Sequence, residues 1–124
     1  TKKKMQNEFC YLSGEDGTAL AYLAQGGHGC ISVTANVAPK LCSEMQKLSL
    51  SNDNEKISEA ENIDKILQPL HKSLFIESNP SPVKYAAKLL NLCDDSVRLP
   101  LVTVMENTKQ EVKKALKIAN LLNE

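Results

Sequence analysis

Residues 9–34 read FCYLSGEDGTALAYLAQGGHGCISVT. Two runs in this stretch, Phe9–Ser13 and Cys30–Thr34, are rich in aromatic or β-branched residues, and each is followed by polar or turn residues, which is typical of strands. Between them, the apolar residues of Thr18–Gln25 recur at helical spacing and end at a Gly-Gly pair, a usual signal for the end of a helix. The stretch therefore predicts a β-α-β unit with two parallel strands joined by a short helix.

A parallel sheet usually binds its ligands beyond the carboxyl ends of its strands. Here those ends are residues 13–17 and residues 34–36. We therefore expect any ligand site to lie at this rim, although no role follows from the sequence for its polar side chains. These side chains are Ser13, Glu15, Asp16 and Asn36.

After Asn36 the pattern is helical to the end of the chain. We expect a helix from Pro39 to about Leu50 and a long amphipathic helix over Ile57–Leu74, with a kink or a break at Pro69. Pro82 is expected in the first turn of a third helix. Thr108–Glu111 has the form of a capping box and predicts the start of the last helix.

Composition excludes several classes of protein. The chain has 124 residues, about half of the roughly 250 that a (β/α)8 barrel needs. Fifteen basic and fifteen acidic side chains cancel, so no overall field favours nucleic acid, and Lys2–Lys4 is expected to be a solvated helix end. No apolar run is long enough to cross a bilayer, and the absence of a signal-peptide core makes the cytoplasm the expected location.

No metal or other cofactor is expected. The four cysteines, Cys10, Cys30, Cys42 and Cys93, contain no C-x-x-C pair and are expected to be buried, reduced thiols. His28 and His71 are far apart in sequence and have no cysteine or carboxylate at ligand spacing.

Four strings carry a resemblance to a known family. In chain order they are LSGEDG, GGHGCISVTANVAP, LHKSLFIESNPSPVK and RLPL. Together they resemble the C-terminal part of the dihydrodipicolinate synthase family, within the class I pyruvate-dependent aldolase superfamily. The resemblance implies an α/β fold: the last two β/α units of a (β/α)8 TIM barrel in residues 1–52, followed by a C-terminal helical domain in residues 53–124.

The resemblance also implies a chemistry. A lysine on a barrel strand forms a Schiff base with pyruvate, and the resulting enamine attacks aspartate semialdehyde in lysine and diaminopimelate biosynthesis. A tyrosine-centred proton relay, a threonine and a substrate-binding arginine assist. The family has these groups upstream of the strand that begins here near Phe9, so we expect the catalytic lysine upstream of Thr1. The complete enzyme is expected to be a homo-oligomer, commonly a tetramer.

The same resemblance assigns substrate binding to two backbone positions. Gly14 matches a glycine that lets the main chain approach the substrate, and Ile31 matches a residue whose main-chain carbonyl faces the pyruvate adduct. Gly14 could instead serve only the turn, and Ile31 only barrel packing. No lysine in the chain has the setting of a Schiff-base former, and Arg98 in RLPL is expected to make a structural ion pair.

Three alternatives stay open at this point. The helical region could be an oligomerisation or interaction module without catalysis. The chain could belong to a related pyruvate lyase such as N-acetylneuraminate lyase. Gly26–Gly29 could bind phosphate, although it precedes its strand and so lies opposite the ligand rim.

Overall fold

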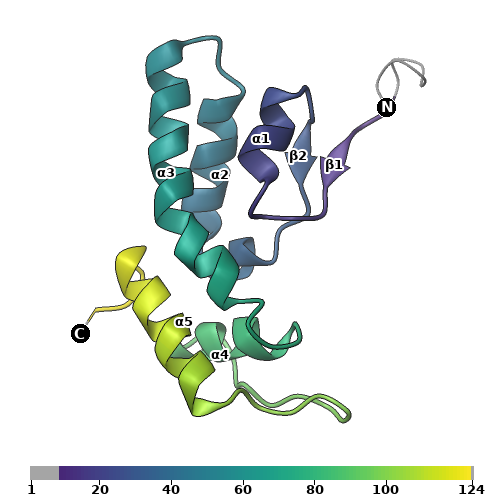
Figure 1. Ribbon diagram of the computed structural model, residues 1–124, viewed down its shortest axis with the longest axis vertical. Helices are drawn as coiled ribbons and strands as arrows, with labels where there is room; N and C mark the ends of the chain where they lie inside the picture. Colours follow the sequence, from purple (N-terminus) through teal and green to yellow (C-terminus); the bar gives the residue numbers. More distant parts are fainter. Residues whose placement is uncertain (1–8, 124) are drawn as a thin grey trace.

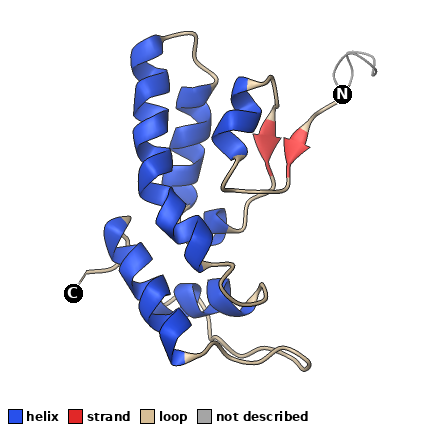
Figure 2. Ribbon diagram, viewed as in Figure 1, coloured by secondary structure: helices blue, strands red, loops and turns tan. Residues whose placement is uncertain are grey.

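Two short parallel strands precede a series of helices in the computed structural model, which describes residues 9–123 (Figure 1). Helices account for nearly all of the regular structure (Figure 2). In chain order the elements are β1 (Leu12–Ser13), α1 (Ala19–Ala24), β2 (Gly29–Cys30), the 3₁₀ helix η2 (Thr34–Asn36), α2 (Pro39–Ser49), α3 (Asn54–Ser73), α4 (Ser81–Leu89) and α5 (Glu106–Ile118).

The predicted β-α-β unit is confirmed. Strands β1 and β2 pair in parallel, with Leu12 opposite Gly29, and helix α1 connects them. The amide of Ile31 donates to the carbonyl of Ser13 at 2.8 Å and prolongs the ladder by one bond. The carboxyl ends of both strands therefore meet at one rim, as the sequence predicts.

Both strands are shorter than predicted, and the second one ends early. Thr34 was expected to close a strand, but it begins η2 instead. The amides of Val33 and Thr34 donate to the carboxylate of Asp16 at 2.8 and 3.1 Å. A side chain that accepts backbone hydrogen bonds competes with the ladder, and here it turns the chain away from the sheet.

Helices α2 and α3 match the sequence pattern. Asp53 caps α3, because its carboxylate accepts from the amide of Glu55 at 3.0 Å. Pro69 lies inside α3, which runs on to Ser73 rather than breaking. Figure 1 shows the helix changing direction in its second half, the kink that proline's missing amide predicts.

Helix α5 starts earlier than predicted. It begins at Glu106, so the expected capping box at Thr108–Glu111 is wrong, and Thr108 is buried inside the first turns. The amide of Met105, just before the helix, donates to the carboxylate of Glu77 at 3.0 Å. A partner distant in sequence thus satisfies an amide at the start of this helix, and local capping signals do not reveal it.

One apolar cluster runs through the molecule from Ala19 to Leu116. It includes the stripe of α3, where the side chains of Leu67 and Leu70 are fully buried, and Leu74 directly after the helix, which is also fully buried. Figure 1 shows α3 beside α2 along its first half and beside α5 near its second. The expected division at residues 52 and 53 falls in the loop between α2 and α3 and stays a prediction.

We predict that hydrogen exchange divides this chain into two parts. The amides of residues 9–34 should exchange fast, because two-residue strands leave most of this segment outside a ladder and two-stranded sheets are marginal in water. The amides of the helices after Glu55 should exchange more slowly. Exchange mass spectrometry of the chain alone checks this, and slow exchange in both parts would contradict it.

Candidate functional site at the rim of the strands

A buried carboxylate organises the rim. Asp16 follows β1 and is 6% exposed. Its Oδ2 accepts the amides of Val33 and Thr34, and its Oδ1 accepts the hydroxyl of Ser32. The Sγ of Cys30 lies 4.0 Å from Oδ1. These contacts join the loop after β1 to the loop after β2, so that the two strand ends form one unit.

The same unit reaches helix α3 through a second buried contact. Thr34 Oγ1 lies 2.7 Å from His71 Nδ1, and both side chains are buried. The Nε2 atom of His71 is buried without a hydrogen-bond partner among residues 9–123. Burial lowers the pKa of His71, although Asp16 and Asp64 act in the opposite direction. The His71 ring is therefore neutral at pH 7, because its pKa lies below the ordinary value of 6.5.

The remaining rim side chains bond locally. Ser13 Oγ accepts from the amide of Glu15 at 3.1 Å, and Thr18 Oγ1 donates to the Glu15 carboxylate at 3.3 Å. Asn36 donates from Nδ2 to the carbonyl of Val33 at 2.9 Å. Each of these bonds joins residues that are at most three positions apart, so these side chains shape their own loops.

The two positions expected to bind substrate lie at this rim. Ile31 directly follows β2, and its side chain is 70% exposed. Gly14 directly follows β1 and is exposed, and a Cβ added to it would meet no atom within 4 Å. Gly26 is the only glycine of the described residues with a positive φ, so the backbone at Gly14 does not itself demand glycine.

No described lysine resembles a Schiff-base former. Every lysine in residues 9–123 lies on a helix, and none lies on a strand. The pKa of Lys88 is raised, mainly by its hydrogen bond to Asp95, which is opposite to the change that makes an amine nucleophilic. The basic start at Lys2–Lys4 lies outside the described residues.

Two expectations need correction. Arg98 is exposed and makes no ion pair within residues 9–123, so the expected structural ion pair is not found there.

The four cysteine thiols were expected to be buried. They are free, but Cys10 and Cys93 are exposed, and only Cys42 is buried. Burial raises the pKa of Cys42 to about 11, so this thiol is unreactive at neutral pH. The exposed pair lies outside the helices and strands, which residue type alone does not reveal.

Other candidate sites in the described part of the chain are weaker. Residues 9–123 contain no group of three or more His, Cys, Asp or Glu that could hold a metal, and none of their helices is long and apolar enough to span a membrane. The glycines before β2 close helix α1, since the amide of Gly27 bonds the carbonyl of Tyr22 at 3.0 Å. His28 accepts the amide of Tyr11 and stacks on its ring. These roles are structural.

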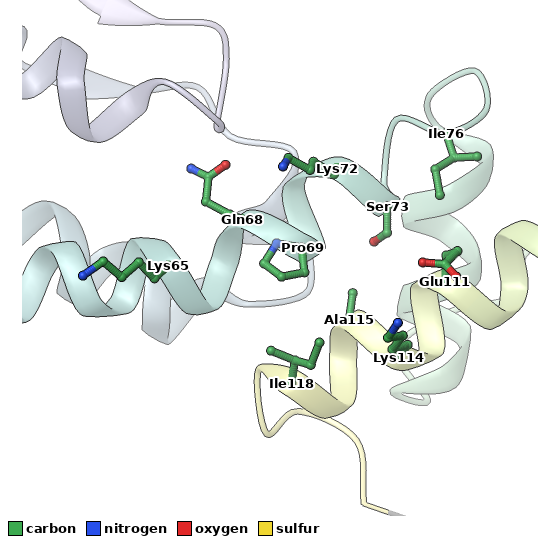
Figure 3. A pocket seen from close by; sticks show the side chains of 10 residues that line it. All are labelled: Lys65, Gln68, Pro69, Lys72, Ser73, Ile76, Glu111, Lys114, Ala115 and Ile118. Atoms are coloured by element: carbon green, nitrogen blue, oxygen red, sulfur yellow. The ribbon is translucent and has the colours of Figure 1, made fainter.

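A groove of about 460 Å³ lies between α3 and α5. Figure 3 shows its wall of Lys65 and Pro69 on one helix and Ala115 and Ile118 on the other. Gln68 also borders it and bonds the carbonyl of Gly17 at 3.0 Å. The groove is open and lies away from Gly14 and Ile31, so the rim remains the better candidate.

Comparison with known proteins identifies the family. The family model described as "Dihydrodipicolinate synthetase family" matches residues 1–119. The chain belongs to this family. Among curated relatives, the 4-hydroxy-tetrahydrodipicolinate synthase of Pelagibacter ubique is 63% identical over 121 residues, and that of Parvibaculum lavamentivorans is 53% identical over 122 residues. Each alignment covers 98% of this chain and 41% of the relative, so the chain spans about two fifths of these relatives' length.

Solved structures of family members share the fold. The dihydrodipicolinate synthase of Thermotoga maritima is 37% identical, with a TM-score of 0.90, and the match covers 97% of this chain and 40% of that one. The enzyme of Cyanidioschyzon merolae, solved with lysine bound, is 29% identical, also with a TM-score of 0.90, over 98% of this chain and 40% of that one. The family and its fold are therefore shown for this chain.

Sequence reasoning placed Asp16 at the rim but missed its role, and it missed the contact of His71 altogether. The partners of Asp16 are 16 to 18 residues away, and Thr34 and His71 are 37 residues apart. No periodic pattern encodes such pairs. The signal that could have found His71 is its position on the buried stripe of α3, one residue after Leu70.

We predict that His71 makes stability depend on pH. Because its folded pKa is below the unfolded value of about 6.5, the unfolded chain takes up the proton first. The free energy of unfolding should therefore fall as the pH drops below about 6.5 toward the folded pKa, by at most about 1.4 kcal/mol per pH unit. Urea denaturation between pH 7.5 and 5.5 measures the slope. The variant His71→Gln should show a shallower slope, and an equal slope in both proteins would refute the assignment.

Proposed function

We propose that the complete protein carrying this chain is a 4-hydroxy-tetrahydrodipicolinate synthase, which condenses pyruvate with aspartate semialdehyde in lysine and diaminopimelate biosynthesis. The observation that carries the proposal is the 63% identity to the Pelagibacter ubique enzyme over 98% of the chain. In this proposal the chain supplies the last two β/α units of a (β/α)8 barrel and the helical region that follows them.

In this proposal the condensation depends on the amine of a lysine side chain. The amine attacks the keto carbon of pyruvate and loses water to form an imine, and removal of a methyl proton then gives an enamine that attacks the aldehyde carbon. Every lysine of residues 9–123 is on a helix, so we assign the Schiff-base lysine to a strand of the barrel outside this chain.

The chain's own contribution is backbone geometry at the rim. In this proposal the Ile31 carbonyl faces the pyruvate adduct, and the main chain at Gly14 lies against the substrate. The environment of Gly14 supports this assignment, because neither its φ nor any neighbouring atom of this chain requires glycine. A close approach by substrate gives a reason for the missing Cβ.

The complete enzyme is proposed to act in the cytoplasm as a homo-oligomer, commonly a tetramer, without a cofactor. A similar solved structure is that of a monomeric dihydrodipicolinate synthase variant, which supports a fold compatible with more than one oligomeric state. The exposed side chains of Leu12 and Ile31 at the sheet support cover by the rest of the barrel rather than exposure to water.

We predict that the chain alone forms no Schiff base with pyruvate. Borohydride reduction in the presence of pyruvate should leave its mass unchanged, because every lysine of residues 9–123 lies on a helix and none lies on a strand of the barrel. The complete protein should gain one reduced pyruvyl group under the same conditions and turn over aspartate semialdehyde. An adduct with turnover on the chain alone would contradict the proposal. A complete protein without any adduct would favour an interaction module, and turnover of N-acetylneuraminate would indicate the related lyase.

We predict that the variant Gly14→Ala keeps the stability of the chain but lowers the activity of the complete enzyme. The added methyl group meets no atom of this chain, so the stability of the chain should be unchanged or rise by up to about 1 kcal/mol. In the complete enzyme, kcat/KM for pyruvate should fall by about tenfold, because the methyl group occupies the space of the substrate. Melting temperatures and steady-state kinetics check the two parts. Unchanged kinetics would leave Gly14 as an ordinary turn residue.

A further inference from the structure

We propose that Asp16 is a positioning residue for the reaction: its buried carboxylate fixes the main chain that follows Ile31 and thereby aims the Ile31 carbonyl at pyruvate. The inference rests on the proposed function, because it concerns the same site. It adds a residue to which the family resemblance assigned no role.

The contacts of Asp16 fall on the residues directly after Ile31. The hydroxyl of Ser32 donates to Oδ1, and the amides of Val33 and Thr34 donate to Oδ2 at 2.8 and 3.1 Å. One side chain therefore holds three consecutive residues. Ser32 Oγ also accepts the amide of Ala35 at 2.8 Å, which fixes the direction of its hydroxyl toward the carboxylate.

The peptide bond of Ile31 is held from both sides. On the N-terminal side, its amide donates to the Ser13 carbonyl at 2.8 Å. On the C-terminal side, Asp16 holds Ser32 and Val33. A peptide unit is planar, so with both flanks held the carbonyl between them can change direction only by a concerted rotation of ψ at Ile31 and φ at Ser32. No hydrogen bond within residues 9–123 reaches the Ile31 carbonyl oxygen, so it is free to face a ligand.

We call the three hydrogen bonds from residues 32–34 to the Asp16 carboxylate the Asp16 clamp. Asp16 and Thr34, which lie at the two ends of this clamp, are also bonded to the helices. The Asp16 carbonyl accepts the amide of Ala19 at 3.1 Å, which ties Asp16 to the start of α1. Thr34 is held by His71 of α3 at 2.7 Å. Asp16 therefore connects two elements that are themselves packed in the core, and it cannot shift without moving one of them.

The Asp16 carboxylate matches the donors around it. It offers two acceptor oxygens and no donor, which matches one hydroxyl and two amides, and charged acceptors make the stronger hydrogen bonds. No cation pairs with Asp16 in the described part of the chain. Such a buried charge is tolerated because its hydrogen bonds are complete, and its geometry is therefore closely fixed.

The test compares three variants of the complete enzyme. Asp16→Ala removes the clamp. Asp16→Asn keeps its shape, since the amide oxygen can accept the two backbone N–H groups while its NH₂ donates to Ser32 Oγ. Asp53→Ala is the matched control, because Asp53 also accepts a backbone N–H, at the start of α3, and its loss lowers stability away from the rim. The measurements are kcat, the KM for pyruvate, and the rate of borohydride-trappable adduct formation.

We expect Asp16→Ala to slow adduct formation by about tenfold or more, because displacement of a positioning group by about 1 Å is enough for such an effect. Asp16→Asn should stay within about threefold of the wild type, and Asp53→Ala should keep wild-type kinetics despite a lower melting temperature. Normal adduct formation in Asp16→Ala would overturn the inference. A loss in Asp16→Asn as large as in Asp16→Ala would also overturn it, because charge rather than hydrogen-bond geometry would then be responsible.

If Asp16→Ala does not fold, Ser32→Ala takes its place, since it removes one donor to Asp16 and leaves the two amides bound. It should slow adduct formation by about threefold, and unchanged kinetics would count against the clamp. The activity of the wild-type enzyme distinguishes a failure of this inference from a failure of the proposed function. An inactive wild type overturns both, whereas an active wild type with an unaffected Asp16→Ala overturns only the role of Asp16.

Discussion

The structure depends on one constraint: a single helix must bury its apolar stripe against two different partners. Helix α3 packs on α2 with its first half and on α5 with its second half (Figure 1). Leu67 and Leu70 in that second half and Leu74 directly after it are fully buried, and burial of each leucine is worth about 1.5 to 3 kcal/mol. Pro69 lies among them and redirects the helix. A straight helix could not follow both neighbours equally well.

The helices could be predicted from the sequence because an apolar stripe facing the core repeats every three or four residues, as in Ile63, Leu67 and Leu70 of α3. The strands could be predicted in order and direction, but not in length. The second strand ends early because the carboxylate of Asp16 binds the amides of Val33 and Thr34, which a longer strand would have used. The start of α5 was missed for a similar reason, since the amide of Met105 bonds Glu77, 28 residues earlier. Local patterns do not report such distant partners.

For the candidate site, the family resemblance identified the two backbone positions, and the structure showed which hydrogen bonds hold them. Gly14 and Ile31 carry no reactive group, so nothing in their side chains marks them as functional. The structure places them at one rim and shows Ile31 between two sets of backbone hydrogen bonds. It also shows that the polar residues at the rim bond mainly to the chain itself. In the proposed function, the reactive group therefore comes from outside this chain, and the rim contributes main chain held by hydrogen bonds.

The buried contact between Thr34 and His71 has a consequence for how such proteins can be recombined. It joins the loop after β2 to α3 across 37 residues, and His71 Nε2 has no second partner among the described residues to compensate for its loss. A chimera that takes the strands from one relative and the helices from another separates this pair at any crossover between the two positions. The new neighbour of His71 must then offer a hydroxyl at the same place, or the ring stays buried with both nitrogens unbonded. Productive crossovers in this region are therefore those in which both parents have a matching pair of residues at positions 34 and 71.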